Sequence, residues 1–227
     1  TNICLNENYG YTKVFTDFYI FAPEPYADEK IKVIIEEKEI PDSNIFKDIE
    51  ELEDLYDMLV DDFKSRIGEE EKPRLPLIII DDLAFSGKIS NRFNALAKVF
   101  CNSRKFLISC LVTSQAYTQT AKNIRLQASA IIIFQTSNKE LEVIETENNY
   151  LKGGKKAFYK MFRDNVKEKH DFICINYSNN YNELYLDKNF KPIAEVINSE
   201  NEDKSPERPP CKKSSQQQEE KNNSKKK

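Results

Sequence analysis

The sequence predicts one α/β domain built on a mainly parallel β-sheet with flanking helices. Three observations lead to this prediction: short apolar runs of strand length, longer segments of helical period between them, and a change of composition near Asn198. With 227 residues, 39% of them hydrophobic, the chain is long enough for one packed core and short for two. We expect residues 1–197 to form that domain.

The strands are predicted where apolar runs end at polar or turn residues. Helices cover both faces of a parallel sheet, so its strands are apolar on both sides. The candidate strands are residues 18–21, 77–80, 106–112, 130–135 and 172–176. Residues 172–177 and 184–186 lie on either side of Asn179 and Asn180, a pattern typical of a β-hairpin.

Two amphipathic helices are predicted between the strands. The first carries apolar residues three or four positions apart, namely Ile45, Ile49, Leu52, Tyr56, Leu59 and Phe63. Asp42 or Ser43 could cap its start, and Gly68 could end it. The second covers residues 91–102, with Phe93, Leu96, Ala97 and Phe100 on one face.

Residues 198–227 form a polar tail that we predict to be disordered. Glu, Lys, Ser, Gln, Asn and Pro replace nearly every large apolar residue there, so the segment cannot bury enough surface to offset the entropy of ordering it. Deleting the tail is therefore expected to leave the thermal midpoint of unfolding unchanged in a calorimetric scan. A fall of several degrees would contradict its predicted disorder.

The composition limits the cellular compartment in which the protein can act. The five cysteines, an odd number without CxxC spacing, indicate a reducing compartment, and no apolar run approaches the length of a membrane span. We expect a soluble, intracellular protein without a membrane partner.

The net charge of −4 leaves DNA binding open, because a local basic surface can bind DNA on an acidic protein. His170 is the only histidine, which excludes a metal site built from several histidines and argues against a Ser-His-Asp hydrolase.

Two carboxylates, Asp81 and Asp82, directly follow the apolar run at residues 77–80. The carboxyl ends of parallel strands form the ligand crevice of an open α/β sheet, so both acids would lie there. In nucleotide hydrolases this is the Walker B arrangement, in which one acid binds Mg²⁺ and the next activates the attacking water. We assign Mg²⁺ to Asp81 and the role of base to Asp82. The alternative is a buried strand that ends in a polar turn.

Gln115 follows the next predicted strand, about thirty residues later. A polar side chain at the end of a strand beside Walker B can reach the γ-phosphate or the attacking water. We therefore predict that Gln115 senses the nucleotide and that it lies within about 12 Å of Asp81, two to three strand spacings. On its own, a Gln at a strand end is an ordinary exposed residue.

The order of these motifs resembles that of genome-packaging ATPases of large DNA viruses, including poxviruses, and of virophages, within the FtsK/HerA superfamily. The similar segments are residues 77–82 (LIIIDD), 102–109 (NSRKFLIS), 111–115 (LVTSQ), 123–125 (NIR) and 130–134 (AIIIF). Residues 19–23 upstream, and 155–162 with the hairpin downstream, also fit. The resemblance implies a P-loop NTPase of the RecA/ASCE type that binds ATP and Mg²⁺.

Two departures from the family pattern stand out. Members usually carry Arg-His where this chain has Arg104-Lys105. The Walker A motif, Gly-x-x-x-x-Gly-Lys-Ser/Thr, is missing, since neither Gly87-Lys88 nor Gly153-Gly154-Lys155 has its spacing. The segment therefore lacks the first strand and P-loop of the fold. Because the chain starts at Thr1, we expect that an upstream portion carries the loop; the alternative is a degenerate relative that has lost catalysis.

The resemblance also implies partners and a place of action. It implies a homo-oligomeric ring that moves double-stranded DNA into a capsid, in the cytoplasm of an infected cell or in the virion, with a capsid or portal-vertex protein as a further partner. In such rings an arginine of one subunit contacts the nucleotide of its neighbour, and Arg125 ranks ahead of Arg104 for this role. The alternatives are a non-catalytic subunit that joins a ring or a capsid, and a metal-dependent nuclease, which would need further acidic residues.

Overall fold

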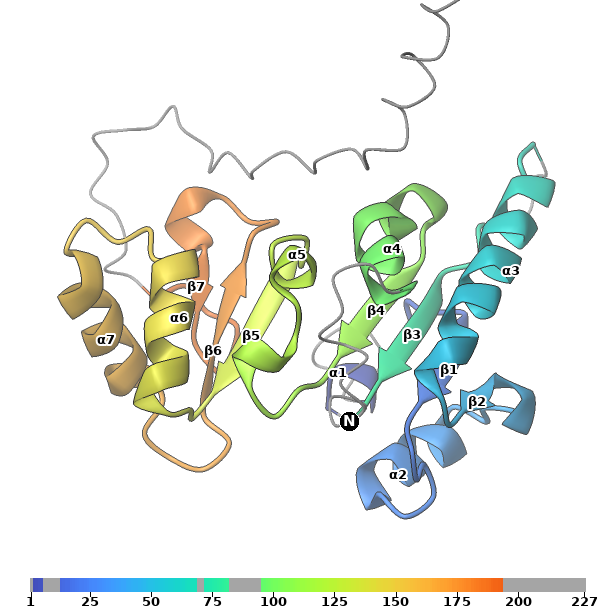
Figure 1. The fold of residues 1–227 in the computed structure, drawn as a ribbon, viewed down its shortest axis with the longest axis horizontal. Coiled ribbons are helices and arrows are strands. Elements are labelled where there is room, and N and C mark those ends of the chain that lie inside the picture. The colour runs from blue at the N-terminus through green and yellow to red at the C-terminus, as the bar shows by residue number, and fades with distance from the viewer. Residues whose placement is uncertain (1, 6–12, 69–71, 82–94, 194–227) are drawn as a thin grey trace, which may run out of the picture.

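The structure is a computed structural model that describes residues 2–5, 13–68, 72–81 and 95–193 (Figure 1). In chain order its helices and strands are α1 (Asn2–Leu5), β1 (Asp17–Phe21), α2 (Glu29–Glu37), β2 (Ile45–Phe46), α3 (Leu52–Ser65), β3 (Pro76–Ile80), α4 (Ala95–Asn102), β4 (Ser109–Val112), α5 (Lys122–Arg125), β5 (Ala130–Phe134), α6 (Asn138–Asn148), α7 (Gly154–Asn165), β6 (Phe172–Asn176) and β7 (Tyr185–Leu186). None of the helices in these ranges is long and apolar enough to span a membrane.

Four strands form a parallel sheet in the order β2-β1-β3-β4. Its register places Phe21 of β1 opposite Ile80 of β3, and Ile80 opposite Val112 of β4. Since these strands run the same way, the residues that follow them meet at one edge. The predicted α/β class with a mainly parallel sheet is confirmed.

Helices cover both faces of this sheet, which explains why β3 is apolar along its whole length and β1 is apolar from Phe18 onward. Alternate strand residues point to opposite faces. Phe18, Ile20, Leu77 and Ile79 pack with Ile31, Ile34 and Ile35 of α2. On the other face Tyr19, Phe21, Ile78 and Ile80 pack with α3 and α4 through Leu52, Leu55, Tyr56, Leu59, Leu96 and Val99. Burying each such aliphatic side chain stabilises the fold by about 1.5–3 kcal/mol, so the sheet is a rigid support for the loops at its edge.

The remaining strands form a separate antiparallel sheet in the order β5-β6-β7. Helices α6 and α7 supply Leu141, Ile144, Phe158, Met161 and Phe162 to its core. Figure 1 shows both helices beside this sheet. The predicted hairpin is confirmed as β6 and β7. The prediction that residues 130–135 and 172–176 join the largely parallel sheet is wrong, because the apolar pattern of a run does not specify its pairing partner or its direction.

Two element boundaries also differ from the predicted ones. Ile45 belongs to β2, which pairs with β1, rather than to the first helix. That helix is preceded by a 3-10 turn at Ile49–Glu51, whose start is capped by Asp48 instead of Asp42 or Ser43: the Asp48 carboxylate accepts a hydrogen bond of 3.1 Å from the Glu50 amide. The spacing of three or four residues that suggested a helix began by chance inside an extended segment.

The strand predicted at residues 106–112 begins only at Ser109. Residues Ser103–Phe106 form a 3-10 turn, and Leu107 then takes a left-handed conformation with φ of 57°, which stops regular structure before the strand. The second predicted helix is present as α4. Residues 91–94 of its predicted range, Phe93 among them, and the tail from residue 198 lie outside the described residues.

Candidate nucleotide-binding site

Asp81 lies at the edge of the parallel sheet where β1, β3 and β4 end. Its backbone N–H donates a hydrogen bond of 2.8 Å to the carbonyl of Phe21, which ties the end of β3 to the end of β1. On the other side, the amide of Thr113 donates to the carbonyl of Ile80 at 2.9 Å, which extends the pairing of β3 with β4. The half-buried Asp81 is therefore held at the carboxyl edge of the sheet, where open parallel α/β sheets bind their ligands.

Thr113, which the sequence did not single out, contacts Asp81 directly. Its Oγ1 hydroxyl donates a hydrogen bond of 2.5 Å to Oδ1 of Asp81. This hydrogen bond engages one carboxylate oxygen and fixes the orientation of the other. All the polar side-chain atoms that the two residues offer to a ligand are oxygens. Carboxylate and hydroxyl oxygens suit Mg²⁺, which uses one or two carboxylates together with phosphates and water. The clue to Thr113 was the register, since Val112 opposes Ile80 and the next residues must therefore meet.

Gln115 lies two residues beyond Thr113 and is exposed. Two residues span at most about 7 Å, so the Cα atoms of Gln115 and Thr113 are no farther apart than that. Directly after Gln115 the chain turns: the Ser114 hydroxyl donates to the carbonyl of Ala116 at 2.8 Å, and the Ala116 amide donates to Oε1 of Gln119 at 3.1 Å. The segment that carries Gln115 is thus held as a closed turn, while its role as sensor stays a prediction.

Asp82, the predicted base, lies outside the described residues, as does the Gly87-Lys88 pair. Within the described ranges, no cluster of three or more His, Cys, Asp or Glu side chains could hold a metal ion. A magnesium nucleotide needs no such cluster, because its phosphates supply several of the ligands. The described part of the candidate site consists of the predicted Asp81 and Gln115 together with Thr113, which the structure adds.

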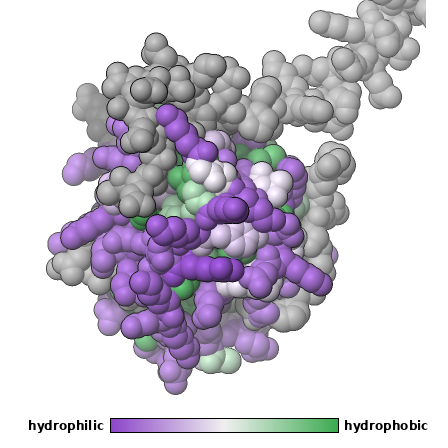
Figure 2. Space-filling model, turned by 90° about the vertical axis from the view of Figure 1, so that its left-hand side faces the viewer, coloured by the Kyte–Doolittle hydropathy of each residue, from purple (hydrophilic) through white to green (hydrophobic). Residues whose placement is uncertain are grey.

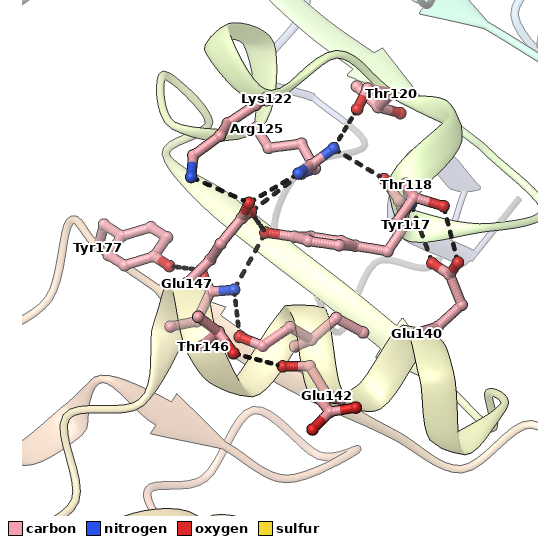
Figure 3. A network of polar contacts seen from close by, with 12 residues as sticks. Tyr117, Thr118, Thr120, Lys122, Arg125, Glu140, Glu142, Thr146, Glu147 and Tyr177 are labelled. Atoms are coloured by element: carbon pink, nitrogen blue, oxygen red, sulfur yellow. Dashed lines mark hydrogen bonds and ion pairs between the residues drawn. The ribbon is translucent and has the colours of Figure 1, made fainter.

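Arg125 is buried in an ion pair with Glu147 (Figure 3). Its Nε and Nη2 donate to the two carboxylate oxygens of Glu147 at 3.1 and 2.8 Å, and its Nη1 donates to the carbonyl of Thr120. The two side chains are only 9% and 8% exposed. The Arg125 guanidinium also lies 4.4 Å from the centre of the Tyr117 ring. Reaching a neighbouring subunit would break all of these contacts, which weighs against the trans role predicted for Arg125.

Tyr117 connects this ion pair to helix α6 and to the antiparallel sheet. Its hydroxyl donates to Glu147 at 2.8 Å and accepts a hydrogen bond of 3.0 Å from the Asn148 amide. Burial, together with the Glu147 carboxylate, raises the pKa of Tyr117 to about 12, so it keeps its proton at neutral pH. The buried Asn148 in turn accepts hydrogen bonds from the hydroxyls of Tyr177 and Tyr185. Sequence reasoning did not find this cluster, because its members are separated by up to 68 positions, from Tyr117 to Tyr185.

Glu140 makes a second connection between the turn after β4 and helix α6. Its carboxylate accepts hydrogen bonds from the backbone amide of Thr118 at 2.9 Å and from the Thr118 hydroxyl at 2.7 Å (Figure 3). The segment that follows Gln115 is thereby fixed to α6 at both ends of the helix. A shift of the turn on nucleotide binding would have to move α6 or break these bonds.

Arg104 lies elsewhere, in the 3-10 turn that precedes β4. It is exposed, and Nη2 donates a hydrogen bond of 2.8 Å to the Ser129 hydroxyl. Since Thr113 follows the other end of β4, the structure does not bring Arg104 to Asp81 of its own subunit. Such a position leaves Arg104 accessible to a neighbouring molecule.

Comparison with known proteins identifies a family. The family model described as "Poxvirus A32 protein" matches residues 44–203, which is more than half of the chain. The match includes α3, Asp81, Thr113, Gln115 and the whole antiparallel sheet. No curated protein sequence matches the chain.

Several solved structures are similar to this chain, each with a TM-score below 0.5. The genome packaging NTPase B204 from Sulfolobus turreted icosahedral virus 2, in complex with AMPPCP, is 13% identical over 77% of this chain and 84% of its own, with a TM-score of 0.48. Its complex with ATP-gammaS is 16% identical with the same coverage and TM-score. B204, the DNA-packaging ATPase from Sulfolobus turreted icosahedral virus, is 13% identical over 70% and 77% of the two chains, with a TM-score of 0.46.

Proposed function

The chain belongs to the Poxvirus A32 protein family, and on this premise we propose that it works in an ATP-driven motor that packages a viral genome, as double-stranded DNA, into capsids. The observation that carries the proposal is the acid at the end of β3, hydrogen-bonded to the hydroxyl at the end of β4. This is where a parallel α/β sheet binds its ligand, and the oxygen atoms there suit a magnesium nucleotide.

In this mechanism each strand-end residue has one role. Asp81 would hold the Mg²⁺ of a magnesium nucleotide, which would neutralise negative charge on the phosphates, with Thr113 keeping the Asp81 carboxylate in place. Asp82, the next residue, accepts a proton from the attacking water or orients it. Gln115 contacts the γ-phosphate or that water and so reports whether the nucleotide is intact.

The phosphates themselves need a P-loop, whose amides and lysine supply most of their binding. In the described part of the chain, β4 pairs only with β3, and β5 pairs only with β6. Strand β4 therefore keeps one edge that could receive another strand. We propose that the strand leading into the P-loop pairs there, which would bring the loop next to Thr113 and Asp81.

Motors of this kind work as rings, in which an arginine of one subunit completes the site of the next. The exposed Arg104 is better placed for this role than Arg125, whose guanidinium is engaged within its own subunit. We propose that the protein acts as a homo-oligomer in the cytoplasm of an infected cell or in the virion.

ATP hydrolysis tests the proposal. Residues 1–227 alone are expected to hydrolyse ATP no faster than the buffer control, because nothing in this sequence matches the P-loop. A version extended upstream by a strand, a Gly-x-x-x-x-Gly-Lys-Ser/Thr loop and a helix is expected to show Mg²⁺-dependent hydrolysis that DNA and oligomerisation stimulate. Phosphate release by the two proteins, with their thermal midpoints compared, is the measurement.

Two outcomes would contradict this mechanism. Robust hydrolysis by residues 1–227 would show that phosphate binding does not depend on a separate P-loop. A folded, ATP-binding extended version without hydrolysis would favour the second candidate, a non-catalytic subunit that joins a ring or a capsid.

A further inference from the structure

Helix α7 has two faces of opposite character. Phe158, Met161 and Phe162 point into the core of the antiparallel sheet and are at most 9% exposed. The other face carries four cations, Lys155, Lys156, Lys160 and Arg163, around Tyr159. These residues and Asp164 line an open, shallow depression of about 500 Å³ on the surface. We call the four cations with Tyr159 the α7 basic face.

The charge of this face is largely uncompensated. Lys155 pairs with Glu142 of α6 at 2.6 Å, but in the described part of the chain no carboxylate pairs with Lys156, Lys160 or Arg163. These three residues are four and three positions apart, so they follow one another along the helix at steps of about 6 and 4.5 Å. They form a short row of cations on a chain whose net charge is −4.

Tyr159 adds an aromatic ring to the row. Lys155 Nζ lies 5.6 Å and Arg163 Cζ 5.7 Å from the ring centre, distances at which a cation is attracted to an aromatic face. These contacts hold two long side chains near a common surface. Less rotamer entropy is then lost when they bind a ligand.

We propose that the α7 basic face binds the phosphate backbone of duplex DNA, an inference that rests on the proposed function and assigns the DNA to one surface. A protein partner fits less well. Protein interfaces have an apolar centre and few lysines, whereas interfaces with DNA are polar and strongly cationic. No large hydrophobic side chain of α7 is exposed. Figure 2 views the side of the molecule on which α7 lies, and the described residues there are mostly hydrophilic.

This placement would connect DNA to the nucleotide site through one helix. Glu142 of α6 contacts Lys155, while Glu140 and Glu147 of α6 contact the segment that follows Gln115. Helix α6 thus lies between the predicted sensor and the α7 basic face.

The test is equilibrium binding of a short fluorescein-labelled DNA duplex of mixed sequence, measured by anisotropy over a series of salt concentrations without nucleotide. The triple variant Lys156→Ala, Lys160→Ala, Arg163→Ala is expected to bind the duplex at least about tenfold more weakly at about 0.1 M salt. At this salt concentration each phosphate contact raises the binding constant by up to about eightfold. The slope of log K against log salt should fall by as much as about 2.7, or about 0.9 for each cation.

Two controls accompany the triple variant. Lys30→Ala, Lys32→Ala, Lys47→Ala removes the same charge from exposed positions on α2 and directly after β2, and should bind DNA as the wild type does. Lys156→Arg, Lys160→Arg, Arg163→Lys keeps the charge and should also bind normally, since phosphate contacts depend mainly on charge.

Each remaining outcome overturns the assignment. If both triple alanine variants lose affinity equally, net charge and not the α7 face governs binding. If the wild type binds DNA and the α7 variant binds it equally, the surface is wrong but the proposed motor stands. If the wild type does not bind the duplex at any salt concentration, the surface proposal fails and DNA as the motor's substrate is in question.

Discussion

In a version of the protein that carries a P-loop, Asp82→Asn is expected to lower the turnover of ATP by about 10²–10⁴-fold, the range typical of losing a general base. Asn keeps the size of Asp but cannot accept a proton from water. ATP binding should change little, because the proposed role of Asp82 begins only when the water attacks. Single-turnover hydrolysis and equilibrium binding of an ATP analogue separate the two effects.

Asp81→Asn is the matched comparison, since the two acids are adjacent in the chain. Asp81 accepts a hydrogen bond from Thr113 and is assigned to Mg²⁺, so its loss should weaken binding of the magnesium nucleotide as well as turnover. Unchanged turnover in Asp82→Asn, or identical effects of the two substitutions on binding, would contradict the division of roles.

Glu147→Gln is expected to lower the stability of the folded protein by about 2–3 kcal/mol, because it leaves the Arg125 cation buried without its counter-charge. Removing one partner of a fully buried ion pair costs about 3–5 kcal/mol. We expect less here, because the Thr120 carbonyl still accepts a hydrogen bond from Arg125 and the new amide keeps the shape of the side chain. In a domain of this size the thermal midpoint should fall by roughly 4–12 °C.

The effect of Glu147→Gln should depend on pH. Burial alone would raise the pKa of Glu147, but the hydrogen bonds and charge of Arg125, with the hydrogen bond from Tyr117, outweigh it and hold the pKa below its ordinary value of 4.5. A carboxylate with a lowered pKa in the folded state contributes stability above its ordinary pKa and loses it as the pH falls through the lowered one. The wild type and the variant should therefore differ fully above pH 4.5 and converge below it.

Glu142→Gln supplies the control on the same helix. The ion pair of Glu142 with Lys155 is exposed on both sides, at 60% and 54%, so solvent screens it and its loss should not shift the thermal midpoint measurably. A Glu147→Gln variant as stable as Glu142→Gln would show that the Arg125 pair does not anchor α6.

The sequence determined the parts of this protein that depend on local pattern. Apolar runs located β1 and β3, because both faces of those strands are buried and a buried strand needs no alternation. The abrupt change from Ile80 to Asp81 located the strand end and the candidate acid. The order of short motifs indicated the family, since order and spacing survive where identity is low. The hairpin at β6 and β7 followed from turn residues between two apolar runs.

Only the tertiary structure decided how distant segments meet. The register of β3 with β4 placed Thr113 against Asp81, although the two are 32 positions apart. Pairing also put β5 into an antiparallel sheet, and it made β2 from residues that had helical spacing. In the sequence, Arg125 is only a basic residue in a polar stretch. In the folded chain it pairs with Glu147, and both side chains are buried. Strand partners, register and burial are properties of pairs of segments, so no pattern within one segment specifies them.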